Sequence, residues 1–186
     1  MNVYDFDKTI YKSDSTLDFY LFCLKKMPFI LKRLPKQFYS AVLYKLGKIT
    51  KTEFKENFYI FLNDLPDIDI LINEFWNIHC GKIKNFYLDG KKDDDVIISA
   101  SPTFLLEPIC KKLNITYLIA SKVDKHTGKY TGINCYGSEK VRRFKEIFPN
   151  QSIDNFYSDS LSDAPIAKLA KHAFLVSKKH IKNWEP

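Results

Sequence analysis

The 186-residue sequence lacks the features that mark membrane-spanning and disulfide-bonded proteins. No uninterrupted apolar run approaches the ~20 residues that a membrane-spanning helix needs. No apolar signal segment precedes the first apolar run, which begins at Val3. The four cysteines show no paired spacing of the metal-binding type, and they are Cys23, Cys80, Cys110 and Cys135. We therefore expect a reduced, cytoplasmic protein.

Metal-ligand patterns and nucleic-acid-binding motifs are also missing. The histidines are expected on the surface or in packing rather than at a zinc site, and they are His79, His126, His172 and His180. The formal net charge of +7 favours anionic partners but says nothing about the fold. Because no nucleic-acid-binding motif accompanies this charge, we expect an anionic substrate and no nucleic acid.

Acidic residues are absent from residues 19–52, where eight basic residues stand. The basic residues are Lys25, Lys26, Lys32, Arg33, Lys36, Lys45, Lys48 and Lys51. Aromatic and aliphatic side chains are interleaved with them, which is typical of a helix that lies on an anionic membrane surface. The alternative is a soluble helix whose apolar face lies in the core and whose lysines are solvated. The first interpretation places the protein peripherally at the inner face of the membrane.

What the sequence does contain is typical of a soluble globular protein. Apolar residues make up 45% of it and charged residues 27%, which are ordinary values. A chain of this length can bury a sizeable core in one domain, or in one domain with an insertion.

Residues 14–87 have their apolar side chains at helical spacing, as in Leu17, Tyr20 and Leu24. Polar residues suited to cap helices stand at positions 14–16 and 50–52. No strand signal of comparable quality occurs in this part of the chain. We interpret residues 14–87 as a helical insertion in a catalytic core that comprises residues 1–13 and 88–186.

Short apolar runs separated by helical spacers follow residue 90. Near-continuous apolar strands that alternate with helices predict an α/β fold with a doubly wound parallel sheet. Ligands bind beyond the carboxyl ends of the strands in such folds, and Asp5, Ser99 and Asp159 each stand at one of these ends. The runs lie at residues 96–98, 115–120, 155–157 and 173–176.

The first apolar run of the chain ends in two carboxylates, Asp5 and Asp7. Alternate residues of a strand share a face, so the two charges would crowd each other unless the chain turns or a cation lies between them. A hard cation such as Mg²⁺ takes one or two carboxylates and completes its shell with water and substrate phosphate. Taken alone, Asp-x-Asp is also typical of a plain turn or helix start.

Two later stretches carry further polar residues at element ends. One predicts a helix start with Ser138 as the cap and Lys140 in the first turn, where a lysine opposes the helix dipole by roughly a few tenths of a kcal/mol. Pairing with a phosphate and a carboxylate would explain Lys140, and an ordinary solvated lysine is the alternative. Asp159 and Asp163 follow a strand end, where Ser162 or Asp163 is also suited to cap a helix.

These stretches resemble the four motifs of the haloacid dehalogenase (HAD) phosphatases. Asp5-Phe6-Asp7-Lys8-Thr9 is similar to the first motif, Ile97-Ile98-Ser99 to the second, Lys140 to the third, and Ser158-Asp159 with Asp163 to the fourth. The helical insertion resembles the cap of the phosphoserine phosphatase-like branch, subfamily IB. Within that branch, Ser99-Ala100-Ser101-Pro102 and Tyr157-Ser158-Asp159-Ser160 look most similar to the C-type phosphatidylglycerophosphatases. Lys8 and Ser158 depart from the pattern, because glycine is common at both positions.

The resemblance implies a Rossmann-like sheet in strand order 5-4-1-2-3, with the helical cap packed over the strand ends. It also implies that Asp5 is the nucleophile that forms an aspartyl-phosphate, and that Asp7 is the general acid and then the general base. Ser99, the backbone N–H of Ala100 and Lys140 would hold the substrate phosphate.

Magnesium is the cofactor that the resemblance implies. Its ligands would be a carboxylate oxygen of Asp5, the backbone carbonyl of Asp7 and the side chain of Asp159. Thr9 and Asp163 would support the site, with Asp163 orienting Lys140 or a metal-bound water.

The predicted activity is Mg²⁺-dependent hydrolysis of a phosphomonoester. A lipid phosphate such as phosphatidylglycerophosphate agrees with the basic stretch and with the C-type resemblance. The alternative is a small soluble ester, phosphoserine-like or a sugar phosphate, toward which the lysines only steer the anion. A non-catalytic module that keeps the fold and holds an anionic partner is a third interpretation.

Overall fold

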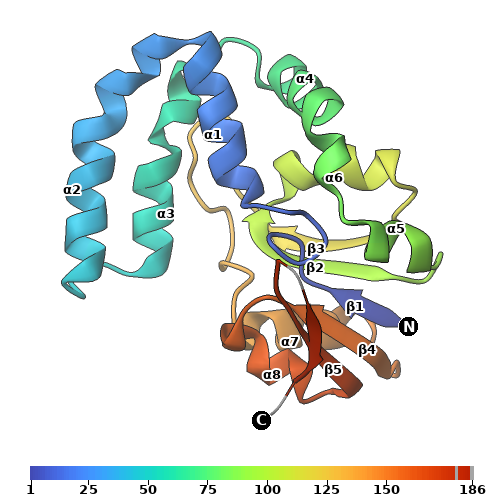
Figure 1. Cartoon of the computed structure of the whole chain (residues 1–186). Coiled ribbons are helices and arrows are strands. Elements are labelled where there is room, and N and C mark those ends of the chain that lie inside the picture. The colour runs from blue at the N-terminus through green and yellow to red at the C-terminus, as the bar shows by residue number, and fades with distance from the viewer. Residues whose placement is uncertain (179, 185–186) are drawn as a thin grey trace.

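The computed structural model describes residues 1–178 and 180–184. Its central element is a six-stranded sheet (Figure 1). The strand order is β3-β2-β1-β4-β5-β6, so the predicted order of five strands is confirmed. Those five strands are parallel, and β6 adds an antiparallel edge to β5. The strands are β1 Asn2–Tyr4, β2 Val96–Pro102, β3 Tyr117–Ser121, β4 Ile153–Ser158, β5 Ala170–Val176 and β6 Ile181–Asn183.

Side chains of the central strands alternate between two buried clusters, one on each face of the sheet. Val3 and Ile98 pack with Phe144 on one face, where α7 (Ser138–Ile147) and α8 (Ala164–Ala167) lie. Tyr4 and Ile97 belong to the cluster on the other face, which includes residues of α5 (Asn85–Gly90) and α6 (Thr103–Lys112). This two-sided burial explains why the strands read as near-continuous apolar runs.

Helical elements occupy the chain between β1 and β2. Asp14 accepts a hydrogen bond from the Leu17 N–H at 2.9 Å, and Thr50 forms a reciprocal capping box with Glu53. Within residues 1–178 and 180–184, none of the helices combines the length and apolar character that crossing a bilayer requires. The elements are α1 Ser15–Lys26, η1 Pro28–Arg33, α2 Leu34–Lys45, α3 Lys51–Tyr59, η2 Ile60–Asp64, α4 Ile68–His79, η3 Cys80–Lys82 and α5.

Helix α2 differs from the expectation for a soluble helix. Its buried side chains are polar, Gln37 and Ser40, whereas Leu34, Phe38 and Tyr39 are exposed. The interpretation that the apolar residues of this stretch form a core is therefore wrong for α2.

Two local predictions are corrected. Helix α7 is preceded by Gly137 at the N-cap position with φ of 60°, a left-handed conformation that glycine adopts without strain, so Ser138 is not the cap. The sequence around Thr127-Gly128 also predicts a small β-hairpin that turns at these two residues. The structure keeps only its shortest form, a single antiparallel bridge between Val123 and Tyr130. In that loop Gly128 packs so closely that a Cβ atom would lie 2.6 Å from the Cβ of Tyr59.

Candidate active site

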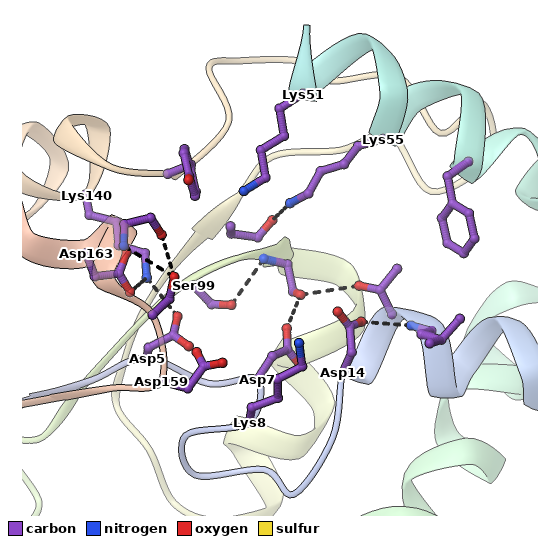
Figure 2. Close-up of a pocket in the computed structure, with 18 of the residues that line it drawn as sticks. Asp5, Asp7, Lys8, Asp14, Lys51, Lys55, Ser99, Lys140, Asp159 and Asp163 are labelled. Carbon is purple, nitrogen blue, oxygen red and sulfur yellow. Dashed lines mark hydrogen bonds and ion pairs between the residues drawn. The ribbon is translucent and has the colours of Figure 1, made fainter. Parts of the chain in front are cut away.

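A cavity of about 410 Å³ opens at the carboxyl ends of β1, β2 and β4, between them and helix α3. Figure 2 shows Asp5 and Asp159 on the strand side, with Lys51 and Lys55 reaching toward them from α3. The parallel register brings the strand ends together, because Tyr4 pairs with Ile97 on one side and with Tyr157 on the other. Residues that are far apart in sequence therefore line one cavity.

Lys140 is the charged residue around which the buried part of the site is arranged. Its side chain is 2% exposed, and Nζ donates to Asp5 Oδ1 at 2.7 Å and to Asp163 Oδ2 at 2.7 Å. The Ser158 hydroxyl donates to the same Asp163 oxygen at 2.7 Å. Burial opposes the charge of Lys140, but the two carboxylates outweigh that effect and hold its pKa above the usual range.

Asp5 follows β1 and is fixed from several directions. Its N–H donates to the Tyr157 carbonyl, and the Thr9 hydroxyl donates to its Oδ2 at 3.3 Å. The same hydroxyl accepts the Asp159 N–H at 2.9 Å, so Thr9 joins the first and fourth motifs. Burial raises the pKa of Asp5 to about 6, although Lys140 offsets part of the rise. Burial also raises the pKa of Asp159.

Asp7 has a separate environment, because the chain turns after Asp5. Its carboxylate accepts hydrogen bonds from the Ser15 N–H at 2.6 Å and from the Ser101 hydroxyl at 2.5 Å. Burial, followed by the nearby charge of Asp14, raises the pKa of Asp7 to about 7. Asp7 is therefore suited to carry a proton near neutral pH.

The end of β2 contributes three consecutive small residues to the cavity. Ser99 is 1% exposed, and its hydroxyl accepts the Ser101 N–H at 3.1 Å. The Ala100 carbonyl accepts hydrogen bonds from Lys55 Nζ at 2.8 Å and from the Ser121 hydroxyl at 3.1 Å. These contacts fix the backbone beside Asp5 and Asp7.

Two lysines of α3 line the cavity opposite the carboxylates. Burial, and then the charge of Lys51, lowers the pKa of Lys55 to about 8. Lys51 Nζ lies over the Tyr136 ring, 3.4 Å from its centroid. The sequence predicts Lys51 only as part of the basic stretch, and it predicts no role for Lys55, Ser101 or Tyr136. A signal for Lys55 exists in retrospect, since residues four apart share a helix face.

Lys8 and Ser158 stand where the motif that the sequence resembles commonly has glycine, and the structure shows their environments. Lys8 adopts φ of 57°, a left-handed conformation in which glycine is unstrained. Ser158 supplies the hydroxyl that binds Asp163, and its oxygen accepts the Ser160 N–H at 3.1 Å. Serine thus adds a contact that glycine lacks.

The donors around Asp5 are oxygens of the kind that hard divalent cations prefer. Asp159 lies beside Asp5 in Figure 2. The negative charges of Asp159 and Asp163 both raise the pKa of Asp5, so the three carboxylates repel one another. A cation would relieve that repulsion, so the residues fit such an ion. Among the described residues, no group of three or more His, Cys, Asp or Glu side chains is placed to hold a metal.

Comparisons with known proteins point to one family. The model of the haloacid dehalogenase-like hydrolases matches residues 3–168. A probable phosphatase of Mycobacterium tuberculosis is 32% identical over 91 residues, which are 45% of this chain and 32% of that protein. The alignment thus spans about a third of the relative's length.

Solved structures share the fold. A protein of unknown function from Bordetella pertussis Tohama I has a TM-score of 0.74 at 19% identity, covering 93% of this chain and 87% of its own. A phosphoserine phosphohydrolase-like protein from Francisella tularensis has a TM-score of 0.56 at 20% identity, covering 93% and 86%. The predicted α/β fold class is confirmed by these likenesses and by the sheet order.

Proposed function

The chain belongs to the haloacid dehalogenase-like hydrolase family, and from that premise we propose that it hydrolyses phosphomonoesters through a phosphorylated Asp5. The observation that carries the proposal is the pairing of two carboxylates with different environments at one cavity. Asp5 is held by Lys140 at 2.7 Å, whereas Asp7 has no lysine partner among the contacts of the described chain and its pKa is about 7.

In the first half of the reaction Asp5 attacks the phosphorus atom. A bond forms between an Asp5 carboxylate oxygen and phosphorus while the bond from phosphorus to the ester oxygen breaks. Asp7 gives its proton to that ester oxygen, so the product leaves as a neutral alcohol. The raised pKa of Asp7 supports this assignment, because a carboxyl that holds its proton near neutrality can act as the acid.

In the second half Asp7 accepts a proton from water, and the water oxygen bonds to phosphorus. The bond between phosphorus and Asp5 then breaks, which releases inorganic phosphate and restores both carboxyl groups. Ser99, the Ala100 N–H and Lys140 hold the phosphoryl oxygens throughout. Asp163 and Ser158 keep Lys140 aimed at Asp5, and Thr9 fixes Asp5 relative to Asp159.

Magnesium is the cofactor of this proposal, and the carboxylates of Asp5 and Asp159 with the Asp7 carbonyl would hold it. When bound, it neutralises charge on the phosphoryl oxygens. The oxygen-only donor set supports a hard cation over zinc or copper.

Substrate choice is assigned to the helical segment of residues 14–87, which acts as a cap. Lys51 and Lys55 form a cationic wall opposite Asp5, so the favoured substrate carries a second anionic group next to its phosphomonoester. A lipid phosphate such as phosphatidylglycerophosphate meets that requirement, and it places the protein in the cytoplasm, peripherally at the membrane. A soluble phosphoserine-like ester meets it as well, since its carboxylate supplies the second charge.

Steady-state hydrolysis of p-nitrophenyl phosphate with Mg²⁺ tests the proposal. Asp5→Asn should lower kcat by a factor on the order of 10⁴ or more, because the amide is nearly isosteric but is not a nucleophile. Asp89→Asn, an exposed change outside the cavity, is the matched control and should leave kcat unchanged. Removing the metal with EDTA should silence the wild type reversibly. An inert wild type on a broad phosphomonoester panel would favour the non-catalytic anion-binding module.

A further inference from the structure

Helix α2 presents an apolar face to solvent. Exposed apolar side chains follow one another along it and just beyond its end, with Phe38 73% and Leu46 64% exposed. An amphipathic helix of a globular protein normally turns this face to the core and its polar face outward. The α2 face, as we define it, consists of Leu34, Phe38, Tyr39, Val42 and Leu46.

Specific contacts fix the orientation of α2. Gln37 is buried, and its side-chain N–H group donates to the Phe58 carbonyl at 2.8 Å while its oxygen accepts from the Tyr20 hydroxyl at 3.1 Å. The buried Ser40 hydroxyl has no hydrogen-bond partner in the described part of the chain. Turning polar groups inward has a free-energy cost. Binding of a partner to the outward apolar face would offset this free-energy cost.

Positive charge surrounds the α2 face without acidic partners. Lys36, Lys45 and Lys48 are exposed and make no ion pair with any described residue. Other basic residues of the stretch are already paired, since Lys26 contacts Glu74 and Arg33 contacts Asp64. The unpaired lysines are therefore available to an anionic surface.

The α2 face is connected to the cavity through α3. These two helices run side by side in Figure 1, and the Tyr44 ring of α2 stacks on Phe54 of α3 with the centroids 5.1 Å apart. Phe54 lines the cavity together with Lys51 and Lys55. A surface bound to the α2 face would thus lie one helix away from the cationic wall of the site.

We infer that the α2 face docks on an anionic lipid bilayer. The apolar side chains enter the interface while Lys36, Lys45 and Lys48 contact the headgroups. A second copy of the chain is a poorer occupant, because a two-fold interface would bring the same lysines of both copies together. The role of this docking rests on the proposed function, because docking would bring a phosphate on a lipid headgroup to the cavity.

Co-sedimentation of the full chain with vesicles tests docking independently of catalysis. The Asp5→Asn protein is used so that the lipid is not altered during the assay. We expect it to pellet with vesicles of phosphatidylcholine mixed with phosphatidylglycerol, to bind less as salt is raised, and to stay in the supernatant with phosphatidylcholine alone. Failure to pellet with the anionic vesicles at low salt overturns the inference.

Matched variants locate the binding surface. Phe38→Gln with Leu46→Gln should weaken vesicle binding by about tenfold or more, and Lys36→Gln with Lys45→Gln and Lys48→Gln by about a hundredfold at low salt. The apolar control is Ile78→Gln with Ile147→Gln, and the basic control is Lys145→Gln with Lys168→Gln and Lys182→Gln, all at exposed positions away from α2. Equal losses in the controls contradict the α2 face as the docking surface.

Two further readouts separate the failure of docking from the failure of the proposed function. With an active Asp5, the α2 variants should keep their turnover of p-nitrophenyl phosphate and lose turnover of a lipid phosphate in vesicles. Wild type that hydrolyses the soluble ester without binding vesicles rejects docking alone, whereas vesicle binding without any hydrolysis rejects the phosphatase alone. Concentration-dependent dimerisation that Phe38→Gln abolishes, without vesicle binding, would assign the face to a second copy.

Discussion

Charge is arranged in opposite ways at the carboxyl ends of the strands and on α2. At the strand ends, Lys140 is buried and each of its carboxylate partners is fixed by further hydrogen bonds. On α2 the lysines are exposed and lie among exposed apolar side chains. A fixed, dry arrangement suits a reaction whose charges must be positioned in advance. An exposed arrangement without ion-pair partners among the described residues suits a surface whose partner has no fixed shape.

The largest combined effect on stability and turnover is expected from removing the central charge of the strand-end site. Lys140→Met leaves Asp5 and Asp163 buried and uncompensated, so we expect a loss of roughly 3–5 kcal/mol in the free energy of unfolding and of about 10³ or more in kcat. Lys145→Met, an exposed change on the same helix, is the control for both. Denaturant unfolding and p-nitrophenyl phosphate turnover provide the measurements. A stable, fully active Lys140→Met protein would show that the buried charge of Lys140 is needed neither for stability nor for turnover.

The next largest effect is expected on the free energy of unfolding, when a buried aromatic residue of the helical segment is truncated and compared with an exposed one. Trp76 of α4 is 2% exposed and its indole N–H donates to the Leu105 carbonyl, whereas Phe38 of α2 is mostly exposed. Trp76→Ala should lower the free energy of unfolding by about 3–5 kcal/mol, and Phe38→Ala should change it by less than about 0.5 kcal/mol. Thermal and denaturant unfolding of the two variants would measure this. A large loss in Phe38→Ala would mean that α2 packs against the core after all.

The cationic wall of the cavity predicts an intermediate effect on substrate binding. Lys55→Met removes one charge that faces a second anionic group, so KM for an ester carrying such a group should rise about 10- to 100-fold. p-Nitrophenyl phosphate lacks that group, so its KM should change much less, through loss of the Lys55 contact with the Ala100 carbonyl alone. Comparing kcat and KM for both esters, with Lys168→Met as an exposed control elsewhere, provides the measurement. Equal effects on the two esters would assign Lys55 to phosphate binding or to structure.

The pKa of Lys55 also predicts a pH dependence. Burial lowers this pKa to about 8, so the ammonium group is present below that pH and is lost above it. KM for the ester with a second anionic group should therefore rise as pH increases through about 8. In Lys55→Met that step should be absent, and a step that persists in the variant would belong to another residue.

The smallest effect concerns the strained loop after Asp7. Lys8 has φ of 57°, and Lys84 Nζ donates to its carbonyl. Lys8→Gly should raise the free energy of unfolding by about 0.5–1 kcal/mol, because glycine accepts this conformation without strain. Unfolding midpoints of Lys8→Gly and of Lys12→Gly would measure it. A loss of stability in Lys8→Gly would mean that the charge of Lys8 outweighs the strain.

The convergence of the strand-end residues was predictable from sequence. A parallel sheet places its carboxyl ends at one edge, so apolar runs that end at Asp5, Ser99 and Asp159 predict a shared site. The edge strand β6 was not predicted, because its three residues are exposed and carry no alternating apolar pattern. The apolar pattern was sufficient to predict the strands that are buried on both faces of the sheet, and insufficient to predict the exposed edge strand.

The orientation of α2 and the position of Lys55 were not predictable in the same way. Helical periodicity identifies an apolar face but not the direction in which it points, and here hydrogen bonds of Gln37 turn that face outward. Lys55 reaches the cavity only because α3 packs across from the strand ends, which is a property of tertiary packing. The outward orientation of α2 and the position of Lys55 in the cavity therefore depend on how the helices pack, which the sequence pattern does not specify.

The proposed mechanism depends on covalent phosphorylation of Asp5, which can be measured by trapping the phosphorylated enzyme. Wild type mixed with excess phosphomonoester and Mg²⁺, quenched in acid within the first turnover and mapped by peptide mass spectrometry, should carry phosphate on the peptide that contains Asp5. The adduct should be released by hydroxylamine, as expected of an acyl phosphate, and it should be absent from Asp5→Asn. Phosphate found on Ser99 instead, or hydrolysis with no adduct at Asp5 during a single turnover, would exclude Asp5 as the nucleophile.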